Sequence, residues 1–179
     1  MIIAVLPLVL VTLLIFCVYN IYILSFFGIP ENLSMTYYYL KEEKNKAFLF
    51  PLFILMMCCV FSPAWFFLNS YFAFFESQTS ILIYIVCLMM FFLVLLSDYK
   101  EKKIRFYLHY TVAIISSVCE LLWIFIVAYK YWYIPFMILF LSFLAAFFTK
   151  THKCSCIYWL EITAFLSLFI VTFLLSLLL

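Results

Sequence analysis

The sequence has very little charge and almost no glycine, and both shortages limit what this chain can be. Charged residues make up 10% of its 179 positions, against roughly 25% in ordinary soluble domains. No soluble fold of this length could bury so much apolar surface, so most of the chain must face lipid. Gly28 is the one glycine, which excludes helix contacts of the Gly-x-x-x-Gly type. Packing must instead depend on phenylalanine, leucine and methionine.

Several chemical functions also lack their sequence patterns. The net charge is only +2 and no basic stripe with interleaved aromatics occurs, so we expect no nucleic-acid partner. The seven cysteines are odd in number and show no disulfide spacing. His152, Cys154 and Cys156 form at best half of a metal site, so we predict no metal and no cofactor. No phosphate loop or catalytic triad pattern is present.

Hydrophobic residues are what the sequence does contain, at 71% of the chain, and they form long runs. A helix needs ~20 apolar residues to cross the ~30 Å hydrocarbon core of a bilayer. The first run has no Lys or Arg before it and no cleavage site, so we interpret it as a retained span. We predict an all-α polytopic membrane helical bundle, one integral membrane domain over 1–179, with six transmembrane helices at about 2–26, 47–70, 81–97, 107–128, 132–149 and 156–178.

The basic residues are distributed very unevenly between the loops. Nine of the ten lie in the alternate loops 27–46, 98–106 and 150–155, and Lys130 lies on the opposite side. The positive-inside rule places the nine in the cytoplasm. We therefore predict a multi-pass protein of the cytoplasmic (inner) membrane with both termini outside. The same topology places three tryptophans near the outer interface and one near the inner interface, where such rings act as anchors: Trp65, Trp123 and Trp132, and Trp159.

The first cytoplasmic loop, GIPENLSMTYYYLKEEKNKA, is the longest polar stretch. Gly28 and Pro30 end the first helix. From Ser34 to Lys46 no helix breaker occurs, which predicts a short interfacial helix with its three tyrosines at headgroup depth: Tyr37, Tyr38 and Tyr39. An anchored loop helix without chemistry is the interpretation we favour for this segment.

The fourth span carries polar residues on one face. Successive helical residues turn by ~100°, so His109, Ser116 and Glu120 fall on one narrow stripe. Glu120 lies ~20 Å from the cytoplasmic end of the helix. A charged acid at that depth costs ~2.5–3.5 kcal/mol, so the stripe should face other helices. Two interpretations stay open: a functional polar site or proton relay, and a protonated glutamic acid that hydrogen-bonds a neighbouring helix.

Two further residues, Glu161 and Asp98, complete the set of intramembrane polar candidates that we consider. Glu161 lies only ~7 Å from the inner boundary, so its side chain can extend to the headgroups. Asp98 and His109 both lie on the cytoplasmic side, where an Asp–His pair is a candidate for acid/base work, with the carboxylate orienting the imidazole. No nucleophile is placed beside them by spacing, so we predict no catalytic residue.

Two stretches resemble a known group of proteins. YNIYILSFFGIPENLSMTYYYL resembles the first loop of small six-span membrane proteins of unknown function from gut bacteria and their phages, and SDYKEKKIRFYLHYTVAIISS looks like their loop before a His in the fourth span. This resemblance implies six spans and brings no activity with it. A more distant likeness is to the membrane hydrolases that include alkaline ceramidases. Those enzymes use several His and an Asp in seven spans, whereas only Asp98 and His109 correspond here, which speaks against a hydrolase.

The sequence therefore favours a multi-pass integral membrane protein with a non-catalytic binding or regulatory role. The first alternative is a small proton-coupled transporter that uses Glu120, and the second is a lipid-active hydrolase that uses Asp98 and His109. The partners we expect are the lipid bilayer and either a protein partner or a small hydrophobic ligand. The oligomeric state stays open.

Overall fold

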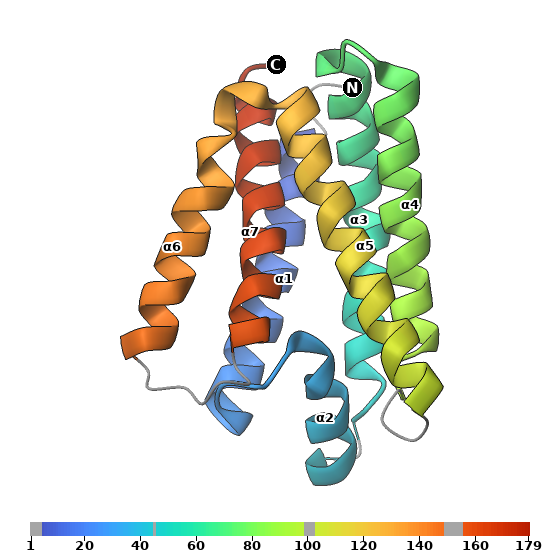
Figure 1. Cartoon of the computed structure of the whole chain (residues 1–179), viewed down its shortest axis with the longest axis vertical. Helices are drawn as coiled ribbons and strands as arrows, with labels where there is room; N and C mark the ends of the chain where they lie inside the picture. Colours follow the sequence, from blue (N-terminus) through green and yellow to red (C-terminus); the bar gives the residue numbers. More distant parts are fainter. Residues whose placement is uncertain (1–4, 45, 99–102, 149–155) are drawn as a thin grey trace.

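The computed structural model of the chain consists of helices that run along one long axis (Figure 1). It describes residues 5–44, 46–98, 103–148 and 156–179. In these ranges the elements, in chain order, are α1 (Val5–Phe27), the 3-10 turn η2 (Leu33–Met35), α2 (Thr36–Lys44), α3 (Leu49–Phe72), α4 (Glu76–Leu95), α5 (Lys103–Val127), the 3-10 turn η3 (Tyr129–Tyr131), α6 (Tyr133–Phe148) and α7 (Cys156–Leu177).

In the described part of the chain, five helices are long and apolar enough to cross a membrane: α1, α3, α4, α5 and α7. The helix predicted at 132–149 is also present, but α6 has 16 residues and is shorter than the other five. The helix predicted from residue 81 begins earlier, at Glu76. The polar first turns of this helix do not belong to the apolar run that the prediction used. Glu76 is favourable in the first turn because the N-terminal end of a helix carries partial positive charge.

The long helices alternate in direction along the bundle (Figure 1). The first turn of α1 and the last turn of α7 lie at one end of the molecule, together with η3 and the turn between α3 and α4. The segment with η2 and α2 lies at the opposite end, which we call the α2 end. α6 lies at the edge of the molecule and packs chiefly against α7.

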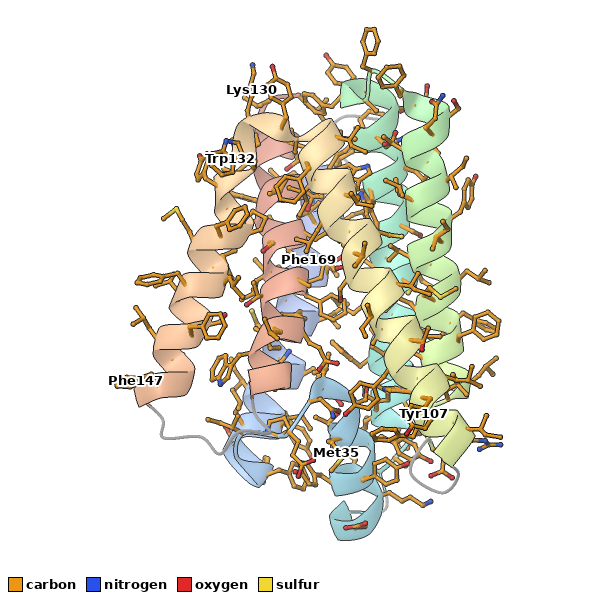
Figure 2. The ribbon with its side chains drawn as sticks, viewed as in Figure 1. Met35, Tyr107, Lys130, Trp132, Phe147 and Phe169 are labelled. Carbon is orange, nitrogen blue, oxygen red and sulfur yellow. The ribbon has the colours of Figure 1, made fainter. Side chains whose placement is uncertain are left out.

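Aromatic rings make the central contacts between helices. Phe169 of α7 meets Phe16 of α1 and Phe61 of α3 edge to face, with ring centroids 5.4 and 5.2 Å apart. Figure 2 shows Phe169 well inside the bundle, between its two ends. Edge-to-face pairs contribute about 0.5–1.5 kcal/mol beyond the area that they bury. They take the place of the small-residue contacts that a chain with one glycine lacks.

Two tryptophans are not placed as interface anchors. Trp65 of α3 is 2% exposed and Trp123 of α5 is fully buried, and their rings meet edge to face at 5.5 Å. The Nε1 of Trp123 donates a hydrogen bond to the Oδ1 of Asn69 over 2.8 Å. Trp132, in contrast, is exposed near the end of the molecule that carries Lys130 (Figure 2). The expectation was wrong for the two buried rings because spacing along a span gives depth and not the direction of the side chain.

The first polar loop forms the short helix that the sequence predicts, but its beginning is buried. Residues 32–40, which we call the 32–40 segment, are buried or partly buried throughout. Hydrogen bonds tie the segment to three long helices: Thr36 to Tyr19 of α1, Asn32 to Tyr110 of α5, and the backbone N–H of Leu33 to Glu161 of α7. The segment therefore fills the α2 end of the bundle instead of lying beside it.

The three tyrosines of α2 pack against the bundle as well. Tyr38 is 7% exposed. The ring of Tyr37 meets Phe50 of α3 edge to face at 6.5 Å, and the ring of Tyr39 stacks on Phe27 of α1 at 5.9 Å. Contacts with α1 and α3 therefore help to determine where these tyrosine rings lie.

Candidate functional site

The polar stripe of α5 faces the interior of the bundle. His109, Ser116 and Glu120 are 3%, 2% and 2% exposed. Ser116 and Glu120 are one turn apart, and the hydroxyl of Ser116 donates a hydrogen bond to the Oε1 of Glu120 over 3.1 Å. This burial follows from the helical angles and from the cost of placing an acid against lipid.

The second carboxyl oxygen of Glu120 differs from the first in its hydrogen bonding. Oε2 is buried and has no hydrogen-bond partner. A buried polar atom without a partner costs about 1–3 kcal/mol, so such atoms are rare and often mark sites with a role in function. Glu120 is thus not held as a purely structural residue would be, with both oxygens satisfied by neighbouring helices.

Glu120 borders a small cavity, which we call the Glu120 cavity. Its volume is about 40 Å³, and apart from Glu120 and Ser62 its walls are apolar or thiol side chains. The lining comes from α3, α4, α5 and α7: Phe53, Ile54, Met57, Cys58, Phe61, Ser62, Trp65, Val86, Cys87, Met90, Glu120, Phe165, Leu168 and Phe169. A lone carboxyl group therefore borders an apolar space in the middle of four helices.

A second cavity, the Glu161 cavity, lies between the first one and the α2 end. Its volume is about 30 Å³ and it shares Ile54, Met90 and Phe165 with the Glu120 cavity. Its walls are more polar, because they include a carboxyl group and several hydroxyl groups: Glu161, Ser34, Ser116 and Ser117. The two cavities are therefore neighbours along the bundle, and Ser116 lies where they meet.

The side chain of Glu161, for which we expected an extended position at the headgroups, has a partner within the protein. Its Oε2 accepts a hydrogen bond of 2.6 Å from the backbone N–H of Leu33, in the first turn of η2. The backbone N–H of Tyr158 also donates to the carbonyl of Glu31 over 3.2 Å. The loop after α1 is thus attached to the start of α7, and this attachment turns the Glu161 carboxylate inward. The sequence position of Glu161 near the end of its span could not reveal Leu33 as its partner, because the two residues are 128 positions apart in the chain.

Asp98 and His109 have different partners. The Oδ1 of Asp98 pairs with the Nζ of Lys41 in α2 at 3.7 Å. The Nε2 of His109 shares a hydrogen bond of 2.7 Å with the hydroxyl of Ser34, and the backbone of Leu96 also interacts with the imidazole. Each side chain therefore helps to hold the α2 end, and among the described residues each has a partner in the 32–41 region.

Metal ligation has little support in the described part of the chain. No group of three or more His, Cys, Asp or Glu is close enough there to hold an ion. Of the His-x-Cys-x-Cys pattern, His152, Cys154 and the side chain of Cys156 lie outside the described part of the chain. The thiols nearest to Glu120 are separate buried or partly buried groups on α3, α4 and α5: Cys58, Cys87 and Cys119.

Sequence reasoning missed two of the residues that shape the site. Asn69 lies in an apolar run, and a polar amide in such a run is a signal that could have been used. In the structure its Nδ2 donates to the Oγ of Ser80 over 2.9 Å, and its Oδ1 accepts from Trp123. Ser34 gave no such signal, because a serine in a polar loop is ordinary and its contact with His109 spans 75 residues.

A scan against protein-family models, a search of curated proteins and a search of solved structures found no match to this chain.

Proposed function

We propose that this chain is a six-span integral protein of the cytoplasmic membrane, with both termini outside, and that it binds a small hydrophobic ligand without transforming it. The five long apolar helices of the described residues and the shorter α6 support the span count, and they alternate in direction (Figure 1). At 1.5 Å per residue, α6 covers about 24 Å, which a bilayer accommodates by local thinning. Membership of the six-span group that the loop sequences resemble is part of this proposal.

The distribution of basic residues supports the orientation. Lys41 of α2 and Arg105, in the first turns of α5, belong to the α2 end, whereas Lys130 of η3 belongs to the opposite end. The positive-inside rule then places the α2 end in the cytoplasm. On this proposal the exposed part of α2, with Lys41 and Glu42, lies at the inner headgroups, and the buried part of the 32–40 segment holds it there.

The observation that carries the binding proposal is the unpartnered Oε2 of Glu120 beside a cavity. A buried acid inside a membrane is costly, and such residues face ligand or ion pathways by default. A ligand that donates a hydrogen bond to Oε2 and places apolar atoms in the cavity would remove the cost of the missing partner. The site would then be complete only when it is occupied.

Native mass spectrometry tests this proposal. Wild-type protein, Glu120→Leu and Val86→Phe would be purified after incubation with an extract of the host membranes. Val86 is buried and lines the Glu120 cavity, so the larger ring fills part of it. Leu141→Phe, at an exposed site on α6, is the matched control.

We expect a small bound molecule on wild-type protein and on Leu141→Phe, and its loss from the two cavity variants. A wild-type protein without any bound molecule, or the same molecule retained by Val86→Phe, would overturn the proposal.

A proton-coupled transporter that uses Glu120 is the second candidate. The two adjoining cavities favour it, because they place hydroxyl and carboxyl groups between the α2 end and Glu120. In proteoliposomes with an imposed pH gradient, this candidate requires a flux that Glu120→Gln abolishes while the variant still folds. A binding protein shows no flux with either chain.

A further inference from the structure

The two cavities have acidic walls without a compensating basic group. Glu120 and Glu161 each line one of them, and no Lys, Arg or His side chain lines either one in the described part of the chain. The titratable groups nearest to Glu120 on other helices are the thiols of Cys58 and Cys87. Cys119 is its neighbour on α5. The positive charge that would balance a carboxylate here must therefore come from a proton or from a ligand.

Aromatic rings form the other main part of the lining. Five of the residues around the Glu120 cavity are aromatic: Phe53, Phe61, Trp65, Phe165 and Phe169. The faces of such rings attract cations, and more strongly when water is excluded. A carboxylate combined with aromatic walls is therefore chemically suited to an organic cation.

Other classes of ligand fit less well. An anion would be repelled by the carboxylates. A hard metal ion takes six or more oxygen ligands, whereas the Glu120 cavity offers side-chain oxygens from Glu120 and Ser62 alone among the described residues. A purely apolar ligand would leave Oε2 without its hydrogen bond. An N–H cation with a small apolar body satisfies both the oxygen and the rings.

We propose that the two cavities form a binding path for a short alkylammonium ion, whose alkyl group is the apolar part of the ligand, with Glu161 near the α2 end and Glu120 at the inner end. This proposal rests on the proposed binding function and names its ligand class. A cavity needs about 10–15 Å³, measured in the same way, to hold one water molecule. The Glu120 cavity, at about 40 Å³, therefore accepts a ligand of a few heavy atoms.

The path begins behind the 32–40 segment. Ser34 and Leu33 form part of the wall of the Glu161 cavity, and the bond between Ser34 and His109 holds this wall in place. A cation that enters from the α2 end meets Glu161 first, then the hydroxyls of Ser116 and Ser117, and then Glu120. The ion binds the ionised carboxylate, so a proton and the amine compete for Glu120.

Calorimetric titration of the purified full-length protein with methylammonium chloride tests this proposal. Methanol is the neutral ligand of similar size, and sodium chloride controls for ionic strength. Glu120→Gln and Glu161→Gln remove one carboxylate each from the path. Glu42→Gln is the matched control, because it removes one carboxylate from an exposed site on α2.

We expect saturable binding of methylammonium, no heat from sodium chloride, and at least tenfold weaker binding of methanol. Glu120→Gln should weaken methylammonium binding at least tenfold, Glu161→Gln should weaken it less, and Glu42→Gln should leave it unchanged. Binding should also weaken as the pH falls, because protons displace the cation.

Three results would overturn the cation proposal: no binding of methylammonium by wild-type protein, equal binding of methanol, or unchanged binding by Glu120→Gln. Mass spectrometry could in that case still find a neutral ligand that is lost from Val86→Phe. This result would support the binding function and reject only the proposal that the ligand is a cation. Loss of both signals would reject both proposals.

Discussion

Glu120 and Asn69 are both buried polar residues, but their hydrogen bonding differs. Asn69 uses its carbonyl oxygen and its amide group, with Trp123, Ser80 and the backbone of Glu76 as partners. Glu120 has one hydrogen bond, from Ser116, and one oxygen without a partner. The first pattern is typical of a residue that stabilises the fold. The second is typical of a residue kept for function at some cost in stability.

This difference predicts opposite effects of the same replacement. Asn69→Leu leaves the Nε1–H of Trp123 without an acceptor in the core and should lower the free energy of unfolding by about 1–3 kcal/mol. Glu120→Leu removes an unpartnered oxygen from apolar surroundings and should change it by less than ~1 kcal/mol, or raise it. Thermal unfolding in the same detergent compares the two. A larger loss for Glu120→Leu would mean that the carboxyl has a structural partner.

Gly28 is needed for its backbone conformation. Its φ is +75°, its N–H donates to the carbonyl of Leu24 over 3.3 Å, and an added Cβ would meet nothing within 4 Å. The cost of Gly28→Ala is therefore conformational and should be about 1–2 kcal/mol of unfolding free energy. Gly28→Asn should cost less, since asparagine tolerates this region better. Equal stability of the alanine variant and wild type would contradict this explanation.

Among the elements, the 32–40 segment joins the helices at the α2 end. It is polar in sequence, yet it is buried because its groups are paired with α1, α5 and α7. Pairing of this kind offsets the cost of removing polar groups from water. Leu33 and Leu40 of the segment also belong to the hydrophobic core, so hydrogen bonds and apolar contacts together hold the segment in place.

Site-directed spin labels would show whether the segment is held in this way. We expect a label at Ser34 to be immobile and inaccessible to water, and a label at the exposed Glu42 to be mobile and accessible. His109→Ala should increase the mobility of a label at the buried Met35, because it removes the partner of the neighbouring Ser34 hydroxyl. Equal accessibility at positions 34 and 42 would show that the whole segment is a surface loop.

For the molecule as a whole, the proposed orientation depends on charge. Among the described residues, Lys41 and Arg105 belong to the α2 end and Lys130 to the opposite end. On the proposed orientation, the cost of translocating the basic residues of the α2 end keeps that end in the cytoplasm. α6 is the shortest of the apolar helices in the described residues. The predicted side of the C-terminus therefore depends on whether α6 crosses the membrane. If α6 does not cross, the C-terminus moves to the cytoplasmic side.

Reporter fusions test both points. A reporter fused after Leu179 should report the outside, and one inserted near residue 102 should report the cytoplasm. Moving charge should weaken the preference: Lys41→Glu together with Arg105→Glu lowers the positive charge at the α2 end and should give mixed orientation. A cytoplasmic C-terminus in the wild-type protein would contradict both the six spans and their direction.

The sequence alone determined the helical class and the approximate ends of every long helix. Runs of apolar residues long enough to cross a bilayer leave few alternatives, because an unpaired backbone is too costly in lipid. It also determined which face of α5 is buried, since helical geometry is local and a glutamate against lipid is expensive.

Only the tertiary structure decided which groups meet. The bond between Ser34 and His109 and the contact of Glu161 with Leu33 join residues far apart in the chain, and no local pattern encodes such pairs. The burial of Trp65 and Trp123 likewise depends on where neighbouring helices lie. The missing partner of Glu120 and the cavity beside it result from the packing of four helices, so they appear only when all four are in place.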